Sequence, residues 1–332
     1  MKLRFPFTPF PNGWFRIAYS HELTLKKVVP LRYFGKDLVL FRTEGGTACV
    51  MDAHCPHLGA HLGYGGKVEG ETIQCPFHGW CFDSNGHCTD IPYTSKIPSK
   101  AQIKTWLVRE VNGLIFVYYH AWGEPPSWEI PELPEYTSEQ WMPFCPTYQW
   151  KLRSHIQELG EQIVDIAHIP TVHLDDSVKS DLPYVDGSVW RQNFSTQRAF
   201  TTRLFNTQIQ TQYEVTLYGL GYSLQKYYTK AITDLHFVLI FLYTPIDEEF
   251  VEVHLVSSVK KLFNKAATFA FTALMLQDLK KEAEKDIAIL EKKLYRPHPL
   301  LCEGDGEIVK YRQWASQFYS EVPAKTQVFV QQ

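Results

Sequence analysis

Two short cysteine–histidine pairs constrain this chain more than any other feature. Residues 55–78 read "CPHLGAHLGYGGKVEGETIQCPFH", in which seventeen residues separate His57 from Cys75. Zinc and iron–sulfur clusters both accept sulfur and imidazole ligands. Zinc fingers, however, place cysteines in one pair and histidines in the other. Here each pair mixes the two residue types, so two cysteines can share one iron and two histidines another.

The stretches "CPHLGA" and "CPFHGW" resemble the two cluster loops of Rieske proteins. In respiratory members of that family each loop has a further cysteine, and the two form a disulfide. This chain has Ala60 and Phe77 at those positions, so the resemblance is to the oxygenase or ferredoxin type. It implies a [2Fe–2S] cluster held by four ligands: Cys55, His57, Cys75 and His78.

Composition narrows the class of protein. The chain has 332 residues, a net charge near −3 and 45% hydrophobic residues, enough for two domains with full cores. It has no basic run interleaved with aromatics, so we expect no nucleic-acid partner. The longest apolar run, residues 266–276, is shorter than the roughly 20 residues of a transmembrane span. With no secretory signal pattern and an odd number of cysteines, seven, we expect a cytoplasmic protein with reduced thiols.

The chain divides into three parts. Residues 1–121 show short β-rich stretches bounded by turn signals, which predicts an all-β domain. Residues 122–136 contain four prolines and are the predicted linker. Residues 137–332 mix long strands with predicted helices near 155–168 and 268–294, and stretches 235–246 and 250–260 form an expected antiparallel hairpin. The predicted fold class is therefore α+β.

A second possible metal site lies in "EQIVDIAHIPTVH", residues 161–173. On a continuous helix His168 and His173 point about 140° apart, but Pro170 interrupts the helix and can let His173 turn back. Two imidazoles with one carboxylate suit a non-haem Fe(II) site. An isolated pair of histidines more often belongs to a core or surface, and only the accompanying Cys/His pairs favour the metal site.

The carboxylate ligand is expected on the helix that contains "QDLKKEAEKDIAILEKKL". Its apolar residues recur at helical spacing and define a buried stripe: Leu279, Ala283, Ile287, Leu290 and Leu294. At 100° per residue Asp286 lies about 60° from the centre of this stripe, closer than the other acidic residues. Glu291 is the next best, whereas Asp278, Glu282 and Glu284 fit a solvated face better.

The segment "DIAHIPTVH" resembles the D-x-x-H-x-x-x-x-H signature of Rieske non-haem iron oxygenases, and "DIAILE" their carboxylate-ligand helix. "FPNGWFRIA" and "EGDGEIVKYRQWASQFY" resemble the ketosteroid 9-alpha-hydroxylase and cholesterol 7-desaturase branch. One departure is Gln162, where relatives usually have Asn. The resemblance implies a helix-grip catalytic domain with mononuclear Fe(II) held by His168, His173 and Asp286, and O2 as co-substrate.

In that family the proteins are typically head-to-tail trimers, and the cluster of one subunit faces the iron of the next. The resemblance implies that Asp165 bridges the two centres, accepting hydrogen bonds from His168 and from His78 of a neighbouring chain. The chain has no dinucleotide fingerprint, since "YGLGYS" lacks the third glycine. Electrons from NAD(P)H must therefore arrive through a separate ferredoxin or flavin reductase.

The expected activity is oxidation of a hydrophobic, sterol-like or aromatic substrate by hydroxylation, desaturation or demethylation. Tryptophan, tyrosine and phenylalanine make up 14% of the chain, enough to line an apolar pocket, although such residues usually fill cores. Two alternatives stay open. One is a Rieske-type electron-transfer protein without oxygenase activity, and the other is a helix-grip binding module with a zinc-stabilised appendage.

Overall fold

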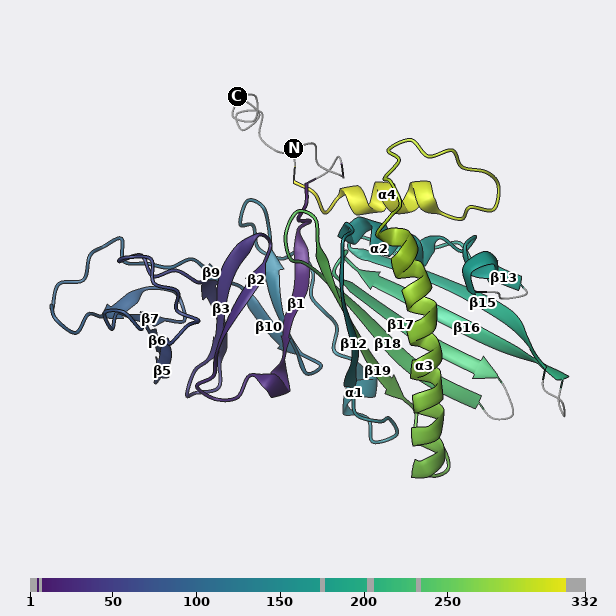
Figure 1. Cartoon of the computed structure of the whole chain (residues 1–332), viewed down its shortest axis with the longest axis horizontal. Coiled ribbons are helices and arrows are strands. Elements are labelled where there is room, and N and C mark those ends of the chain that lie inside the picture. Colours follow the sequence, from purple (N-terminus) through teal and green to yellow (C-terminus); the bar gives the residue numbers. More distant parts are fainter. Residues whose placement is uncertain (1–4, 6–7, 174–176, 202–205, 231–233, 321–332) are drawn as a thin grey trace.

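The computed structural model describes residues 5, 8–173, 177–201, 206–230 and 234–320. A β-rich N-terminal region lies on one side of the molecule, and a broad sheet crossed by a long helix lies on the other (Figure 1). The first part is all-β and the second combines antiparallel sheet with helices. This confirms the predicted α+β class. In the described part of the chain no helix is both long and apolar enough to span a bilayer.

The N-terminal region contains three small antiparallel sheets. One has the order β1-β11-β10, the second β2-β3-β4-β9, and the third β5-β6-β7-β8. The third sheet lies at the far end of the molecule (Figure 1). The strands are β1 (Gly13–Tyr19), β2 (Val28–Tyr33), β3 (Lys36–Arg42), β4 (Ala48–Asp52), β5 (Lys67–Glu69), β6 (Thr72–Gln74), β7 (Cys81–Asp83), β8 (Cys88–Asp90), β9 (Thr105–Trp106), β10 (Val108–Val111) and β11 (Leu114–Tyr119), with a 3₁₀ turn η1 (Ser20–Glu22).

The C-terminal region is built on one eight-stranded antiparallel sheet of order β12-β19-β18-β17-β16-β15-β13, with β14 paired to β15. The predicted hairpin is confirmed as β18 and β19, and Asp247 Oδ1 closes its turn by accepting the N–H groups of Glu249 and Phe250, each at 2.9 Å. The strands are β12 (Cys145–Leu152), β13 (Ser177–Ser180), β14 (Tyr184–Asp186), β15 (Val189–Thr201), β16 (Asn206–Tyr218), β17 (Tyr222–Lys230), β18 (Asp234–Pro245) and β19 (Val251–Val259).

Helix α3 (Lys265–Leu290) runs across one face of this sheet, as a helix-grip fold requires (Figure 1). The Asn264 side chain starts it by accepting the Ala267 N–H at 2.7 Å. The helix ends four residues before the predicted position 294, so Leu294 is 62% exposed and does not belong to the buried stripe as predicted. The other helices are α1 (Pro134–Thr137), α2 (Ile156–Val164) and α4 (Ile308–Ser316), with a π-helical turn η2 (Ile169–His173).

The predicted proline-rich linker, residues 122–136, packs against both regions. Ile130 and Leu133 are buried in a core that also contains Trp14 of β1 and Leu224 of β17. Arg109 donates to the Ile130 carbonyl at 3.0 Å, so β10 fixes the backbone of the segment as well. Because hydrogen bonds and core side chains hold it, this segment joins the two regions rigidly.

A buried polar cluster reinforces the same interface. Arg16 of β1 lies 2.7 Å from Nε2 of His254 on β19, and Tyr19 OH lies 2.9 Å from Nδ1 of that ring. Tyr33 of β2 donates a short hydrogen bond to Glu252. Burial raises the pKa of Glu252, but hydrogen bonds from His254 and Tyr33 and the charge of Arg16 outweigh it and lower the pKa to about 2. The carboxylate is therefore fixed in its charged form between the two regions.

Candidate metal centres and substrate cavity

The two predicted cluster loops have matching backbone geometry. In each loop the cysteine carbonyl accepts the N–H of the glycine four residues later, Gly59 in one loop and Gly79 in the other, at 2.9 and 3.1 Å. Both glycines have positive φ, +76° and +74°, which costs glycine little. Each cysteine N–H also donates to the carbonyl five residues later. The loops therefore close in the same way, with their cysteines at equivalent positions and their histidines two residues later in one loop and three residues later in the other.

The four predicted cluster residues come together. Cys55 and Cys75 are buried at 3% exposure each, and the rings of His57 and His78 lie 4.7 Å apart. His57 also stacks on Trp80 with an interplanar angle of 6°. Burial, with a smaller contribution from Cys75, raises the pKa of the Cys55 thiol to about 11, so its thiolate needs a bound cation.

One buried nitrogen supports a metal at these loops. Nδ1 of His57 is buried and has no hydrogen-bond partner in the described part of the chain. A buried polar atom without a partner is costly and is usually explained by an ion or by function. Two buried sulfurs beside two imidazoles match the donor set of a Rieske [2Fe–2S] cluster. The residues present therefore fit that cluster.

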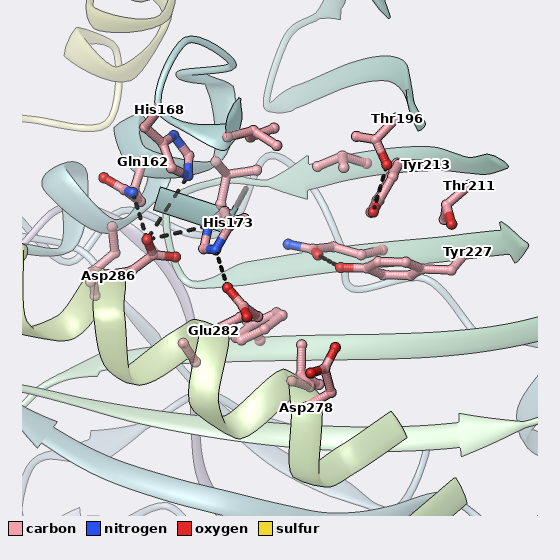
Figure 2. Close-up of a pocket in the computed structure, with 18 of the residues that line it drawn as sticks. Gln162, His168, His173, Thr196, Thr211, Tyr213, Tyr227, Asp278, Glu282 and Asp286 are labelled. Atoms are coloured by element: carbon pink, nitrogen blue, oxygen red, sulfur yellow. Dashed lines mark hydrogen bonds and ion pairs between the residues drawn. The ribbon is translucent and has the colours of Figure 1, made fainter. Parts of the chain in front are cut away.

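The second predicted set also assembles. One ligand atom each from His168, His173 and Asp286 can be chosen so that all three lie within 4.8 Å of one another. Oδ1 of Asp286 is 3.4 Å from Nε2 of His173 and 3.9 Å from Nε2 of His168. Figure 2 shows the two rings and the carboxylate pointing toward one another from η2, the segment before it and α3. The donor set matches a 2-His-1-carboxylate iron site.

The other nitrogen of each ring is engaged elsewhere. Nδ1 of His168 bonds the backbone carbonyl of Asp165, and Nδ1 of His173 lies 2.7 Å from Glu282 Oε2. A carbonyl and a carboxylate can only accept, so both Nδ1 atoms carry the proton and both Nε2 atoms present lone pairs. Such outer hydrogen bonds orient metal-binding histidines. Gln162 donates to Asp286 Oδ1 at 3.2 Å and orients the third group.

Two expectations about acidic residues need correction. Glu282 was expected on a solvated face, but its side chain is 21% exposed and bonds His173. Lys285, at 2.7 Å from Glu282, together with His173 lowers the Glu282 pKa against the effect of burial. The Asp165 carboxylate was expected to bond His168 directly, but its Oδ2 lies 3.9 Å away and its Oδ1 accepts the Ala167 N–H. Its backbone carbonyl makes that bond instead.

The break between the two histidines is also placed differently from the prediction. Helix α2 ends at Val164, ahead of the expected residue 168, with Asp165 as its last capping residue. His168 therefore lies in the turn after the helix. Pro170 lies inside the π-helical turn η2, which ends at His173. The two rings reach a centroid distance of 5.1 Å because the chain leaves the helix before His168.

A cavity of about 450 Å³ lies between α3 and the sheet, with the His168, His173 and Asp286 site in its wall. This volume is typical of sites for drug-sized molecules. Most of the lining is apolar or aromatic. The apolar lining side chains include Trp150, Leu152, Leu159, Ile163, Phe194, Ile209, Val215, Phe237, Phe241, Val253, Met275, Leu279, Ile287 and Leu290.

Among the described lining residues, a polar region lies on the sheet apart from the metal-ligand set. Tyr227 OH donates to Gln225 Oε1 at 2.5 Å, and the hydroxyls of Thr211 and Thr229 lie 3.0 Å apart. In Figure 2 the labelled Thr211, Tyr213 and Tyr227 lie on the sheet, away from Asp286. Two hydroxyls that share one hydrogen bond keep a donor and acceptors for a third group. Sequence patterns missed this region, since its residues are scattered over neighbouring strands.

Two family models match the chain. Residues 13–106 match the Rieske [2Fe-2S] domain, and residues 117–319 match the 3-ketosteroid 9alpha-hydroxylase C-terminal domain. The chain belongs to the Rieske non-haem iron oxygenases. It is the oxygenase component of such a system, which uses a [2Fe–2S] cluster, a mononuclear iron and O2 and receives electrons from partner proteins.

Named relatives fall in the same branch. The chain is 35% identical to the cholesterol 7-desaturase of Xenopus laevis over 94% of this chain and 72% of that protein. It is 29% identical to the oxygenase component of the 3-ketosteroid-9-alpha-monooxygenase of Rhodococcus rhodochrous, over 97% and 88%. This places the oxygenase in the ketosteroid hydroxylase and cholesterol 7-desaturase branch.

Solved structures share the fold. Dicamba monooxygenase bound to dicamba aligns with a TM-score of 0.76 at 17% identity, covering 94% of this chain and 98% of that one. NdmA of Pseudomonas putida CBB5 with caffeine aligns with a TM-score of 0.72 at 18% identity, covering 91% and 89%. At these identities the likeness concerns the fold of this oxygenase and not its substrate.

Proposed function

We propose that this oxygenase hydroxylates or desaturates a sterol- or steroid-like substrate at an iron held by His168, His173 and Asp286. The observation that carries the proposal is the convergence of two imidazole Nε2 atoms on Asp286 Oδ1 in the wall of a largely apolar cavity. The carboxylates of Asp286 and Glu282 outweigh burial and raise the pKa of His173. The same negative potential favours a bound cation.

The cluster ligands follow from the matching loops. We assign Cys55 and Cys75 to one iron of the [2Fe–2S] cluster and His57 and His78 to the other, in a cluster domain of residues 1–121 joined by the 122–136 segment to a catalytic domain of residues 137–332. When bound, the cluster supplies electrons and the mononuclear iron supplies the means to activate O2.

Protein groups around the iron ligands have separate tasks. Glu282 and the Asp165 carbonyl hold the protons on Nδ1 of the two rings, which keeps each Nε2 free to bind metal. Gln162 holds the Asp286 carboxylate by its amide N–H. The apolar walls exclude water from the reacting carbon and hold it beside the metal.

The polar region of the cavity supports an amphipathic, rigid substrate. Asp286 and Met275 both line the cavity from α3, eleven residues apart, which is about 16 Å along the helix. A fused-ring molecule could span this length with its reacting carbon at the iron. A hydroxyl group at its other end would then donate to Tyr227 or pair with Thr211 or Thr229, whereas a keto group would accept from one of the two threonines. The names of the sterol- and steroid-acting relatives agree with this class.

The electron path is proposed to cross between subunits. The strands beside the cluster loops, β5 to β7, lie at the opposite side of the molecule from α3 (Figure 1). A head-to-tail trimer would bring His78 of a neighbouring copy to Asp165, whose side chain is 33% exposed. A ferredoxin or flavin reductase supplies the electrons from NAD(P)H. Since the seven cysteines, all in the described part of the chain, form no disulfide with one another, we place the protein in the reducing cytoplasm.

The test is reconstitution of the full holoprotein with a Rieske-competent reductase and a panel of sterols, 3-ketosteroids and small aromatic acids. We expect O2- and reductant-dependent product from a sterol or 3-ketosteroid, identified by mass spectrometry as a mono-oxygenated or a two-hydrogen-depleted molecule. Turnover of the aromatic acids alone would overturn the proposed substrate class. A cluster that is reduced and re-oxidised while no substrate of the panel is consumed would favour the electron-transfer alternative. The convergence of His168, His173 and Asp286 argues against that alternative.

A further inference from the structure

The lining of the cavity reaches the protein surface near the middle of α3. Among the described residues that line the cavity, Asp278 alone is exposed, whereas Leu290 toward the other end of the helix is 3% exposed. Figure 2 shows Asp278 on α3 at the end away from Asp286. Met275 and Leu279, one turn or less from Asp278, also line the cavity. A substrate therefore passes this part of the helix.

The outer face of the N-terminal half of α3 is apolar. Residues 266–277 contain no charged residue. At 100° per residue the exposed Ala266, Ala270, Ala273 and Gln277 form one row, and Phe269 and Leu274 flank it at about 70° on either side. Phe269 is 61% and Leu274 68% exposed, and Phe263, just before the helix, is 87% exposed. Leu274 lies one turn before Asp278, so the apolar face borders the cavity mouth.

Lysines bracket this face. The segment 260–285 contains six lysines and three acidic residues, although the whole chain has a net charge of −3. Lys260 and Lys261 precede the face, and Lys280 and Lys281 follow it. Lys261 donates to the Glu139 carbonyl and Lys280 lies 3.5 Å from Glu284, so both ammonium groups lie near the protein surface. Exposed Phe and Leu side chains with flanking lysines are the pattern of helices that lie at the surface of an anionic bilayer.

We propose that this face, Phe263, Phe269 and Leu274 with the flanking lysines, docks the oxygenase on an anionic lipid surface with the cavity mouth against the bilayer. The three apolar side chains would enter the boundary between headgroups and acyl chains, and the lysines would pair with lipid phosphates and carboxylates. An apolar substrate would then pass from the bilayer into the cavity without crossing water. This last step rests on the proposed function, whereas the docking itself does not.

Sedimentation with vesicles tests the docking on the full holoprotein. Vesicles of phosphatidylcholine mixed with phosphatidylserine should bind the protein, vesicles of phosphatidylcholine alone should bind it less, and high salt should weaken binding. Phe269→Asp with Leu274→Asp should lower the bound fraction by about tenfold or more, because moving a charged side chain from water into the bilayer interface costs free energy. The matched control, Leu182→Asp with Leu300→Asp, changes two leucines that are 82% and 103% exposed elsewhere and should bind like the parent.

Three outcomes would overturn the docking. The first is no binding of the parent protein to the anionic vesicles, and the second is equal binding of the face variant and the control variant. The third is a loss of oligomers in the face variant alone, which would assign the face to a second copy of the chain. Substrate turnover is measured separately from vesicle binding. The face variant should oxidise a sterol slowly from vesicles and at the parent rate from cyclodextrin. Absence of product from cyclodextrin with the parent protein would count against the proposed function and leave the docking result intact.

Discussion

Glu282 Oε2 accepts a hydrogen bond from His173 Nδ1 at 2.7 Å, and Nε2 of the same ring faces Asp286 Oδ1 at 3.4 Å. Glu282 thus orients the His173 ring, and Asp286, one turn later on the same helix, faces the other nitrogen of that ring as the proposed neighbouring metal ligand. The spacing of four residues places both on the cavity side.

Glu282→Ala should weaken iron binding by about 10- to 100-fold, because the His173 ring loses the acceptor that holds its tautomer and orientation. Iron per chain after dialysis against a mild chelator measures this, and the visible spectrum of the cluster reports an intact fold. Glu284→Ala, on the exposed side of the same helix, is the control and should keep its iron. Equal iron retention in the two variants would remove the proposed role of Glu282.

Asp165→Ala should keep both metal centres but lose coupled turnover by about 10- to 100-fold. The backbone carbonyl, which orients His168, survives this change, so iron content should stay at the parent level. The carboxylate proposed to meet His78 of a neighbouring copy is lost. Metal analysis, cluster reduction by dithionite and product per reduced cluster measure the three steps. Full activity in this variant would refute the bridging role.

Tyr227→Phe should raise KM about tenfold for a substrate with a terminal hydroxyl group, because the substrate O–H loses the tyrosine oxygen as its acceptor and one hydrogen bond is worth about 1.4 kcal/mol. Its hydroxyl bonds Gln225 in the polar region of the cavity, far from the metal ligands, so kcat should change little. Tyr228→Phe is the matched control, because the next residue of a strand points to the opposite face. A substrate analogue without the polar group should show the same KM with both variants.

Glu252→Gln should lower the free energy of unfolding by about 3 kcal/mol, because the native state holds the charged form more strongly than the unfolded chain does. The sign follows from the pKa, which falls from 4.5 to about 2 on folding. The stabilisation is fully present above the unfolded value and is lost only as the pH falls from 4.5 toward 2. Between about pH 6 and 8 the difference between variant and parent, measured by denaturant unfolding, should be constant. A difference that changes within this range would contradict the assignment.

Local patterns in the sequence were sufficient to predict which side chains come together at the two candidate metal sites. The Cys/His pairs and the helical position of Asp286 depend on short spacings, and the structure brings these residues together as expected. The role of Glu282 was missed because a helical wheel measures only the angular distance of a residue from the apolar stripe of its own helix. The Glu282 carboxylate instead faces His173, which comes from another segment of the chain.

Non-local packing set the features that sequence reasoning placed wrongly. The end of α2 at Val164 could not be read from Pro170, because the chain leaves the helix six residues earlier to form the turn that carries His168. The prolines of residues 122–136 correctly excluded regular structure over most of that segment, but not its burial. Ile130 and Leu133 are core residues only because strands from both regions meet around them.

The rigid packing of the 122–136 segment has a genetic consequence. Because this segment packs with the cluster loops on one side of the molecule and α3 on the other, damage to the loops leaves a whole cavity, and damage to the iron ligands leaves a whole cluster. In the proposed trimer a copy altered at His78 and a copy altered at Asp286 would each supply what its neighbour lacks. Two inactive alleles of this gene, expressed together, should therefore restore part of the activity, whereas two alleles damaged at the same centre should not.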